Sequence, residues 1–372
     1  MNMCAKATST GHVAPLSTVL VLNNYTQTGI GDFGLNLTRS LKEAGLLVEV
    51  RETSLGWKGL LSDLKVILTH DATLVANIGL TSWGKSGVRN FLGFLGLGIR
   101  SRRKQTTVIL HNTIEIIDQK DAGYVFSHLT TIGAQFAVGL IRKAKVIAVS
   151  YQVYHTLLQK YKFNNLKYLA HPCTYDATDA FHENNTVNQK RVVTVGYLAK
   201  YKGIEAFISV AKELRDAAKF SIIGGTHRIL NSDPAFIEWH KSVLNAAEDA
   251  GVEIMGYLTN EKMFDELKHS TLGMLSYTSS SGASGSLSTM ASAGLPAVTS
   301  NLPEFEFVAK DGAGIVTANC NDIATLTSIV ASTLNDKDTL SQLSDKQRNY
   351  AKNHSWNSFA KEVTSFITLA QE

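Results

Sequence analysis

The chain has 372 residues, of which 44% are hydrophobic and 18% charged, and its formal net charge is +4. This length suggests two domains, and the composition excludes a disordered or fibrous protein. The mild basicity falls short of the clustered excess typical of a dedicated nucleic-acid-binding protein, so we expect no nucleic-acid partner. It is compatible with an anionic small molecule or a membrane surface.

The cysteine pattern and the hydropathy indicate the cellular compartment. Cys4, Cys173 and Cys320 are far apart and include no CxxC pair. They therefore exclude a disulfide framework and a cysteine-rich zinc module, and they fit a reducing compartment. Residues 1–15 lack the apolar core of a signal peptide, and no stretch reaches the 18–20 apolar residues, roughly, of a membrane span. We expect a cytoplasmic protein.

Short apolar runs bounded by turn residues alternate with amphipathic segments along most of the chain. The runs predict strands at 18–22, 46–51, 73–78, 106–110, 145–149, 191–195, 219–223, 251–255, 272–276 and 297–299. Helical periodicity appears between them, for example over 33–44 and 203–214. This alternation favours parallel sheets and an α/β fold. The polar, turn-rich stretch 171–190 separates two doubly wound domains, whose ligands would bind at the carboxyl ends of the strands.

The first glycine-rich loop follows the first predicted strand. Gly29, Gly31 and Gly34 form a GxGxxG pattern, and Glu49 lies about twenty residues further on, as in a dinucleotide fingerprint. Residues 23–28 separate the strand from the first glycine, whereas the fingerprint requires an almost direct turn. The pattern therefore disfavours NAD, and it predicts contact between an anion and the backbone of Gly29 and Gly31 at a helix start.

Two features of the second half indicate an anion site. Lys202 lies just before a predicted helix in the segment VTVGYLAKYKG of residues 193–203, where an ammonium group suits a diphosphate. The Ser/Gly-rich tract 279–288 connects a predicted strand to a helix of small residues. Its hydroxyl and N–H groups suit an anion or a sugar, and the alternative is a flexible linker.

In these motifs the chain resembles the GT-B glycosyltransferases, specifically the large retaining family four. The resemblance rests on five segments in the family's order: 28–45, 195–203, 252–258, 281–305 and 354–363. It implies an acceptor-binding domain over 1–172, which a C-terminal helix at about 355–372 rejoins, and a nucleotide-sugar-binding domain over 190–350.

The resemblance also implies an activity and a site. The protein would transfer a sugar from a nucleotide diphosphate sugar to an acceptor with retention, without a metal ion or other cofactor. Catalytic roles fall on His111 and Lys202. The donor site would comprise Gly29, Gly31, Tyr197, Lys202, Ser281, Gly282 and Thr289.

The chain departs from the family pattern at three of these positions. Tyr197 stands where the family has arginine, and Ser281 and Thr289 stand where it has a pair of glutamates. Glu304 matches a Pro-Glu pair of the family, and we assign it no chemical role. The departures keep open a weakly catalytic binding or partner subunit, and the fold keeps open a nucleotide-sugar epimerase; a dehydrogenase is the third alternative.

The segment from Phe91 to Lys104 reads FLGFLGLGIRSRRK. Its apolar run beside Arg100, Arg102 and Arg103 is typical of an interfacial segment on anionic lipid, and the alternative is a buried helix with a solvated basic end. On the first interpretation, the protein is peripheral on the inner face of the membrane, and its acceptor is a sugar or a lipid-linked molecule.

Overall fold

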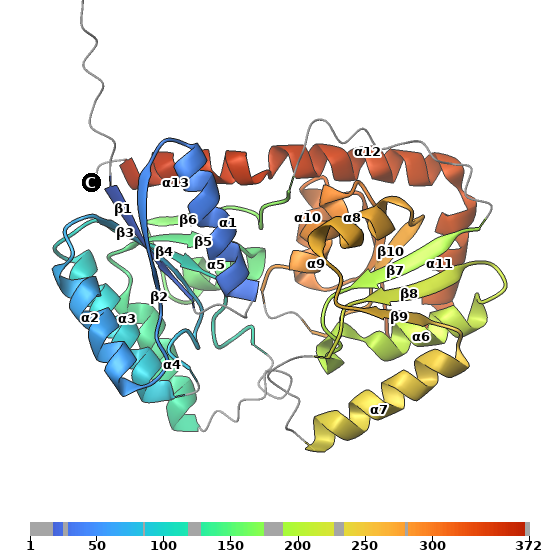
Figure 1. Ribbon diagram of the computed structural model, residues 1–372, viewed down its shortest axis with the longest axis horizontal. Helices are drawn as coiled ribbons and strands as arrows, with labels where there is room; N and C mark the ends of the chain where they lie inside the picture. The colour runs from blue at the N-terminus through green and yellow to red at the C-terminus, as the bar shows by residue number, and fades with distance from the viewer. Residues whose placement is uncertain are drawn as a thin grey trace, which may run out of the picture.

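The computed structural model describes residues 18–24, 29–84, 86–117, 128–174, 189–226, 234–279 and 282–368. They form two α/β halves side by side, bridged by the last two helices along one edge (Figure 1). Each half contains a six-stranded sheet whose strands are all parallel. The predicted fold class, two doubly wound domains, is confirmed.

The N-terminal half has strand order β2-β1-β3-β4-β5-β6. Its strands are β1 (Thr18–Asn23), β2 (Leu47–Glu52), β3 (Thr73–Ile78), β4 (Thr106–Leu110), β5 (Lys145–Ala148) and β6 (Leu166–Tyr168). Its helices are α1 (Gly29–Glu43), α2 (Trp57–Thr69), α3 (Gly87–Ser101), α4 (His128–Leu140) and α5 (Tyr151–Gln159). The sequence predicted five of these strands and missed β6, which has three residues and no fully buried side chain.

The C-terminal half has strand order β12-β11-β10-β7-β8-β9. Its strands are β7 (Arg191–Val195), β8 (Lys219–Ile223), β9 (Glu253–Gly256), β10 (Leu272–Leu275), β11 (Ala297–Ser300) and β12 (Ile315–Ala318). Its helices are the 3₁₀ turn η1 (Lys200–Lys202), α6 (Ile204–Glu213), α7 (Pro234–Asp249), α8 (Asn260–Lys268), α9 (Gly285–Ser292), α10 (Pro303–Lys310), α11 (Ile323–Asn335) and α12 (Lys337–Asn353).

The central strands of each sheet are buried on both faces, which explains why they read as apolar runs. In β1, Leu20 and Leu22 pack with α2, α3 and α4, whereas Val19 and Val21 pack with α1 and with α13 (Trp356–Thr368). Successive side chains of a strand point to opposite faces, so one apolar run supplies two cores.

The last helix returns to the N-terminal half, as the fold class predicts. The chain passes from the first half to the second at Cys173 and comes back at Ser355. The Cys173 N–H donates to the carbonyl of His354 at 2.8 Å, and the Trp356 N–H donates to the carbonyl of Cys173 at 3.2 Å. Helix α13 then packs on α1 through Phe359 and Val363. The two chain crossings are therefore bonded to each other.

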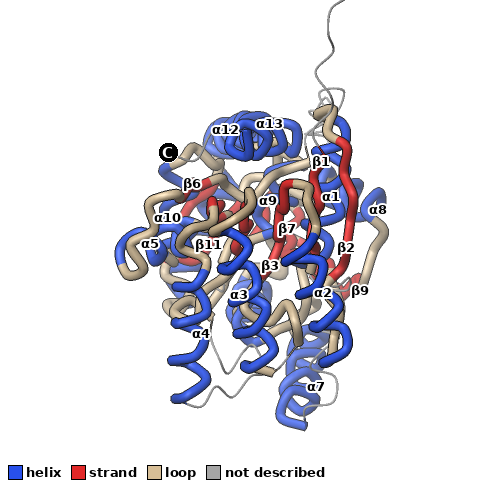
Figure 2. The backbone as a smooth tube through the Cα atoms, turned by 90° about the vertical axis from the view of Figure 1, so that its left-hand side faces the viewer, coloured by secondary structure: helices blue, strands red, loops and turns tan. Residues whose placement is uncertain are grey.

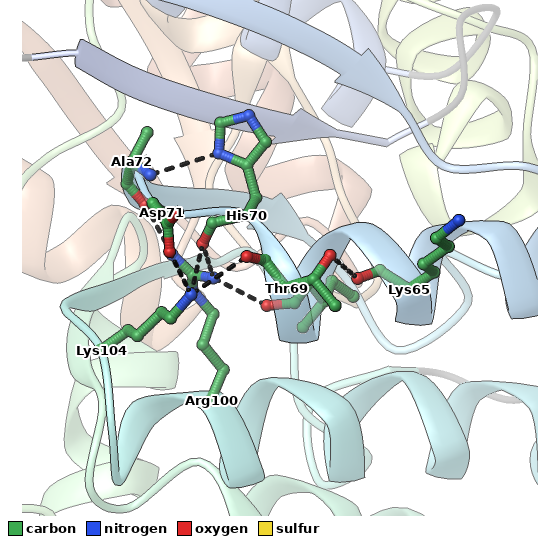
Figure 3. A network of polar contacts seen from close by, with 8 residues as sticks. Lys65, Thr69, His70, Asp71, Ala72, Arg100 and Lys104 are labelled. Carbon is green, nitrogen blue, oxygen red and sulfur yellow. Dashed lines mark hydrogen bonds and ion pairs between the residues drawn. The ribbon is translucent and has the colours of Figure 1, made fainter.

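The segment from Phe91 to Lys104 forms a mostly buried helix with a solvated basic end, which was the alternative interpretation. It falls in α3 and the turn after it, and Phe91 and Phe94 pack in the core against α2 and α4. Arg100 is 2% exposed and donates to the carbonyls of Ile67, His70 and Ala72 at 2.8, 2.7 and 2.5 Å. These bonds satisfy carbonyls at the end of α2 that the helix itself leaves without partners (Figure 3).

Lys104 is bound in the same network. It donates to the carbonyl of Thr69 at 3.0 Å and pairs with Asp71 at 2.7 Å (Figure 3). The prediction placed Arg100 and Lys104, together with Arg102 and Arg103, in a lipid-facing basic cluster. For Arg100 and Lys104 it was wrong, because both side chains point into the joint between α2 and α3. Among the described residues, no helix has both the length and the apolarity needed to cross a bilayer.

Candidate active site

The candidate site of the C-terminal half lies where its strand order reverses, between β7 and β10. In open α/β sheets, ligands bind outside the carboxyl ends of strands at such a switch point. Strand β7 ends at Val195 and leads to Lys202, and β10 ends at Leu275 and leads to Tyr277. Lys202 is the last residue of η1, and Gly203 follows it with a φ of 60°. The backbone of Gly203 lies close to Ser276, since a Cβ on Gly203 would lie 1.8 Å from the Ser276 carbonyl oxygen.

Lys202 is a buried cation, 8% exposed. Its Nζ donates to the Tyr277 hydroxyl at 2.5 Å and to Ser286 Oγ at 3.0 Å. Within the described part of the chain, no carboxylate forms an ion pair with it. Burial disfavours the charged form, but the nearby phenol oxygens of Tyr277 and Tyr201 raise the pKa of Lys202 above its ordinary value. A charged, buried ammonium group without a counter-ion is complementary to an anion.

Helix α9 adds hydrogen-bond donors to the same place. Ser284 caps its N-terminus by accepting from the Leu287 N–H at 3.2 Å. Ser286, in the first turn, donates to the carbonyl of Val195 at 2.7 Å and so fixes the start of α9 against the end of β7. Lys202, Tyr277, Gly282, Ser284 and Gly285 line a pocket of about 80 Å³, and the buried Glu304 also lines it. A helix N-terminus beside a buried lysine is an anion-binding arrangement.

The N-terminal half has its own switch point, between β1 and β3. Asn23 is the last residue of β1 and Asn77 the last but one of β3, and the two are register partners. Asn77 Nδ2 donates to Asn23 Oδ1 and to the carbonyl of Ile30, both at 2.8 Å, and Asn23 Nδ2 donates to the carbonyl of Gly31 at 3.0 Å. The two amides therefore fix the first turn of α1 against the sheet.

His111 joins this amide network from the end of β4. Its Nε2 lies 2.7 Å from Asn77 Oδ1. Because both donations of Asn77 come from Nδ2, its Oδ1 accepts, and the proton of the neutral imidazole is on Nε2 of His111. Burial and then the neighbouring His171 lower the pKa of His111 to about 3. The ring is therefore neutral at physiological pH, with Nδ1 as a hydrogen-bond acceptor.

The two halves meet at His111. Gly282 has a φ of 134°, and a Cβ on it would lie 2.6 Å from the backbone oxygen of His111. Gly282 also lines the pocket of Lys202. The loop before α9 therefore brings the lysine pocket of one half against the histidine of the other.

Glu304 forms a second contact between the halves. Its carboxylate accepts from the Ser150 hydroxyl at 2.8 Å and from the N–H groups of Tyr151 and Gln152 at 3.3 and 3.2 Å. It thus caps the N-terminus of α5 from α10. Burial raises the pKa of Glu304, and these hydrogen bonds oppose the rise. Tyr151 also stacks on Phe307 of α10, with ring centroids 3.8 Å apart.

The structure gives a packing reason for one glycine of the GxGxxG pattern, and it leaves the predicted anion contact of Gly29 and Gly31 a prediction. Gly29 begins α1, and a Cβ there would meet nothing within 4 Å. The carbonyl of Gly31 is bonded to Asn23. Gly34 is the position that requires glycine, since its Cβ would lie 1.7 Å from Asn23 Oδ1. The pattern lets α1 approach the two asparagines closely.

The remaining residues of the predicted donor site lie in different parts of the C-terminal half. Tyr197 follows β7 and packs edge-on against Tyr257, with ring centroids 6.0 Å apart. Thr289 lies one turn into α9 and donates to the carbonyl of Gly285 at 2.9 Å. Ser281 lies outside the described residues.

Sequence reasoning missed Tyr277, Ser286, Asn23 and Asn77. For the asparagines a local signal existed, because Asn23 ends a run that is otherwise apolar and Asn77 stands one residue before the end of another. Tyr277 and Ser286 carry no such signal, since they lie among other tyrosines, serines and glycines. The described residues contain no group of three His, Cys, Asp or Glu side chains arranged to hold a metal ion.

Comparison with solved structures identifies the architecture. HepE of Anabaena, in complex with UDP, superposes with a TM-score of 0.70 at 12% identity, covering 95% of this chain and 100% of HepE. The protein has the GT-B fold. A sucrose-phosphate synthase from Thermosynechococcus elongatus shares this GT-B arrangement, with a TM-score of 0.70, 12% identity and coverage of 94% and 98%.

A glycosyltransferase of Rickettsia africae has the same GT-B fold, with a TM-score of 0.68 at 12% identity and coverage of 95% and 98%. In sequence, residues 189–336 match the family model described as Glycosyl transferases group 1. This match covers the C-terminal half of the GT-B fold, which contains Lys202. No curated protein sequence matches the chain.

Proposed function

We propose that this GT-B protein transfers a sugar from a nucleotide diphosphate sugar to the hydroxyl group of an acceptor. The observation that carries the proposal is Lys202, a buried ammonium group without a carboxylate partner among the described residues, at the switch point of the C-terminal sheet. The match of residues 189–336 to Glycosyl transferases group 1 supports it.

In the proposed reaction, the bond between the anomeric carbon and the diphosphate oxygen breaks, and a bond from that carbon to the acceptor oxygen forms. The acceptor proton passes to the leaving phosphate, and the new bond forms with retention. The negative charge that develops on the leaving oxygen is stabilised by Lys202 and by the N-terminus of α9. These fixed groups take the place that a metal ion has in other transferases.

We propose that His111 contacts the donor sugar. Its neutral ring has Nδ1 available to accept from a sugar hydroxyl, while Asn77 holds Nε2. The contact between Gly282 and the His111 carbonyl supports this role, because it brings His111 beside the lysine pocket. The N-terminal half, to which His111 belongs, would then bind the acceptor, and the C-terminal half the donor.

Uridine diphosphate is the first nucleoside diphosphate to test as part of the donor. Solved structures of Anabaena HepE contain UDP and UDP-glucose, and this chain shares their fold. The pocket of about 80 Å³ is far smaller than the ~300–1,000 Å³ typical of ligand sites. It has room for a phosphate group.

A binding or partner subunit is the second candidate. Thr289 occupies the position of a family glutamate, and its hydroxyl is bonded to Gly285 within its own helix. A side chain used in this way is a weaker partner for a sugar or ribose than a carboxylate. Such a site would bind a diphosphate and turn it over slowly or not at all.

Titration calorimetry with UDP, GDP and ADP, each with magnesium and with EDTA, tests donor binding. We expect one diphosphate to bind equally well under both conditions. Incubation with the matching sugar conjugates and with sugar or polyprenyl acceptors then tests turnover, and the anomeric proton signals of the product test retention. Binding without turnover would favour the partner subunit, and no binding would contradict both candidates.

A further inference from the structure

The outer surface of the N-terminal helical layer is apolar and lacks acidic residues. Helices α2, α3 and α4 lie side by side over one face of the sheet (Figures 1 and 2). Within this helical layer the only carboxylate is Asp63, which is buried and bonded to Arg51 at 3.0 Å. The exposed surfaces of all three helices are therefore free of negative charge.

Large apolar side chains form an outward stripe on each helix. On α2 they are Trp57, Leu61 and Leu68, which a helix of 3.6 residues per turn places on one side. On α3 they are Val88 and Ile99, and on α4 Ile132 and Phe136. Leu61, Val88 and Phe136 are 65%, 60% and 69% exposed. We call the surface formed by these seven side chains the outer helical face. Large apolar side chains gathered on one outer layer in this way are typical of an interaction site.

Basic side chains accompany these stripes. Lys58 and Lys65 are exposed on α2. Arg102, Arg142 and Lys143, beyond the ends of α3 and α4, and Lys162, beyond the end of α5, line a pocket of about 390 Å³ that has no acidic residue in its wall. Cations at helix ends also interact with the helix dipole, but this effect explains neither the apolar stripes nor the absence of acids.

We propose that the outer helical face docks on a membrane surface that contains anionic lipid. Aromatic and aliphatic side chains interleaved with lysines are typical of elements that lie in the interfacial region. The basic pocket beside them would bind a lipid phosphate. This proposal is independent of the proposed function, and it assigns lipid contact to the outward side of the layer, whereas Phe91 and Phe94 of α3 face inward.

Co-sedimentation with vesicles tests the proposal. We expect the protein to sediment with vesicles of phosphatidylcholine and phosphatidylglycerol at least tenfold more strongly than with phosphatidylcholine alone. The difference should shrink in high salt, which screens charges. No sedimentation with either vesicle, or equal sedimentation with both, would overturn the proposal.

Two variants distinguish the apolar stripes from the basic pocket. Replacing Leu61, Val88 and Phe136 by Ser should reduce vesicle binding at least tenfold, and so should Arg102→Glu with Lys143→Glu. The matched control is Ile237→Ser with Leu244→Ser on α7, where both side chains are exposed in the other half. Unchanged thermal unfolding would show that each variant is folded.

Other occupants of this face give different results. If the wild type dimerises in solution, fails to bind vesicles, and loses its dimer in the triple Ser variant, the face is an interface between copies. If the Arg102/Lys143 variant loses affinity for inorganic phosphate but still sediments with vesicles, the pocket binds a free anion. Either result would overturn the lipid proposal.

Discussion

Gly282 and His111 meet backbone to backbone across the two halves of the molecule. A Cβ on Gly282 would lie 2.6 Å from the His111 carbonyl oxygen, and the φ of Gly282 is 134°. Both facts require glycine at this point. This contact joins the pocket of Lys202 to the amide network of the N-terminal half.

Replacing Gly282 by alanine should therefore lower the free energy of unfolding by about 1–3 kcal/mol, the usual cost of a strained backbone conformation. Chemical denaturation measures it. Gly285→Ala is the matched control, because its Cβ would meet only His171 Nε2 at 3.9 Å. Equal free energies of unfolding for the two variants would show that the contact between Gly282 and His111 does not contribute to stability.

Lys202→Ala should weaken binding of a nucleoside diphosphate by about 1.5–3 kcal/mol, the value of a hydrogen bond to a charged group. Calorimetry with UDP measures the change. Lys200→Ala is the control, since Lys200 lies in the same turn η1 and is exposed. If Lys202→Ala binds as tightly as Lys200→Ala, the anion does not contact Lys202.

The buried histidine predicts a pH dependence of stability. The pKa of His111 is about 3 in the folded protein, against 6.5 for a free histidine. The unfolded chain therefore binds an additional proton between these values, so stability falls as the pH drops below 6.5. At pH 5 the loss is about 2 kcal/mol from His111 alone.

His111→Gln should remove this part of the pH dependence. Denaturation of the wild type and the variant at pH 7 and pH 5 measures it as the difference between the two changes. His269→Gln is the control, because His269 is exposed on the surface at the end of α8. Identical pH dependence in wild type and His111→Gln would contradict a buried, neutral His111.

Glu304→Gln should destabilise the contact between α10 and α5. The carboxylate accepts three hydrogen bonds from Ser150, Tyr151 and Gln152, and an amide group has only one oxygen to offer them. We expect a loss of about 1.5–3 kcal/mol in the free energy of unfolding. Glu306→Gln, on the exposed side of the same helix, should leave stability unchanged. If Glu304→Gln leaves the free energy of unfolding unchanged, α5 does not depend on this cap.

Arg100→Met should cost at least about 3 kcal/mol of stability, because it leaves buried carbonyls of Ile67, His70 and Ala72 without this donor. Thermal or chemical denaturation measures the loss. The exposed Arg103→Met is the control and should change stability by less than about 0.5 kcal/mol. Comparable stability of both variants would contradict a structural role for Arg100.

The sequence alone determined most of the architecture. Strands β3, β4, β7 and β8 lie where their apolar runs predict them, because a strand buried on both faces needs an unbroken run of apolar residues. The alternation of these runs with helical periodicity then leaves a doubly wound fold as the natural arrangement. Lys202 was also predictable, as a lysine just before a helix that follows a strand and a glycine.

Only the tertiary structure decided which side chains meet. Asn77 contacts Asn23 across 54 residues, and Glu304 contacts Ser150 across 154. Arg100 belongs to the joint of two helices and not to a basic surface, although its neighbours Arg102 and Arg103 are exposed. A local sequence pattern indicates the periodicity and the polarity of a segment. It does not report which distant backbone groups need a donor, and that need determines where a buried charge points.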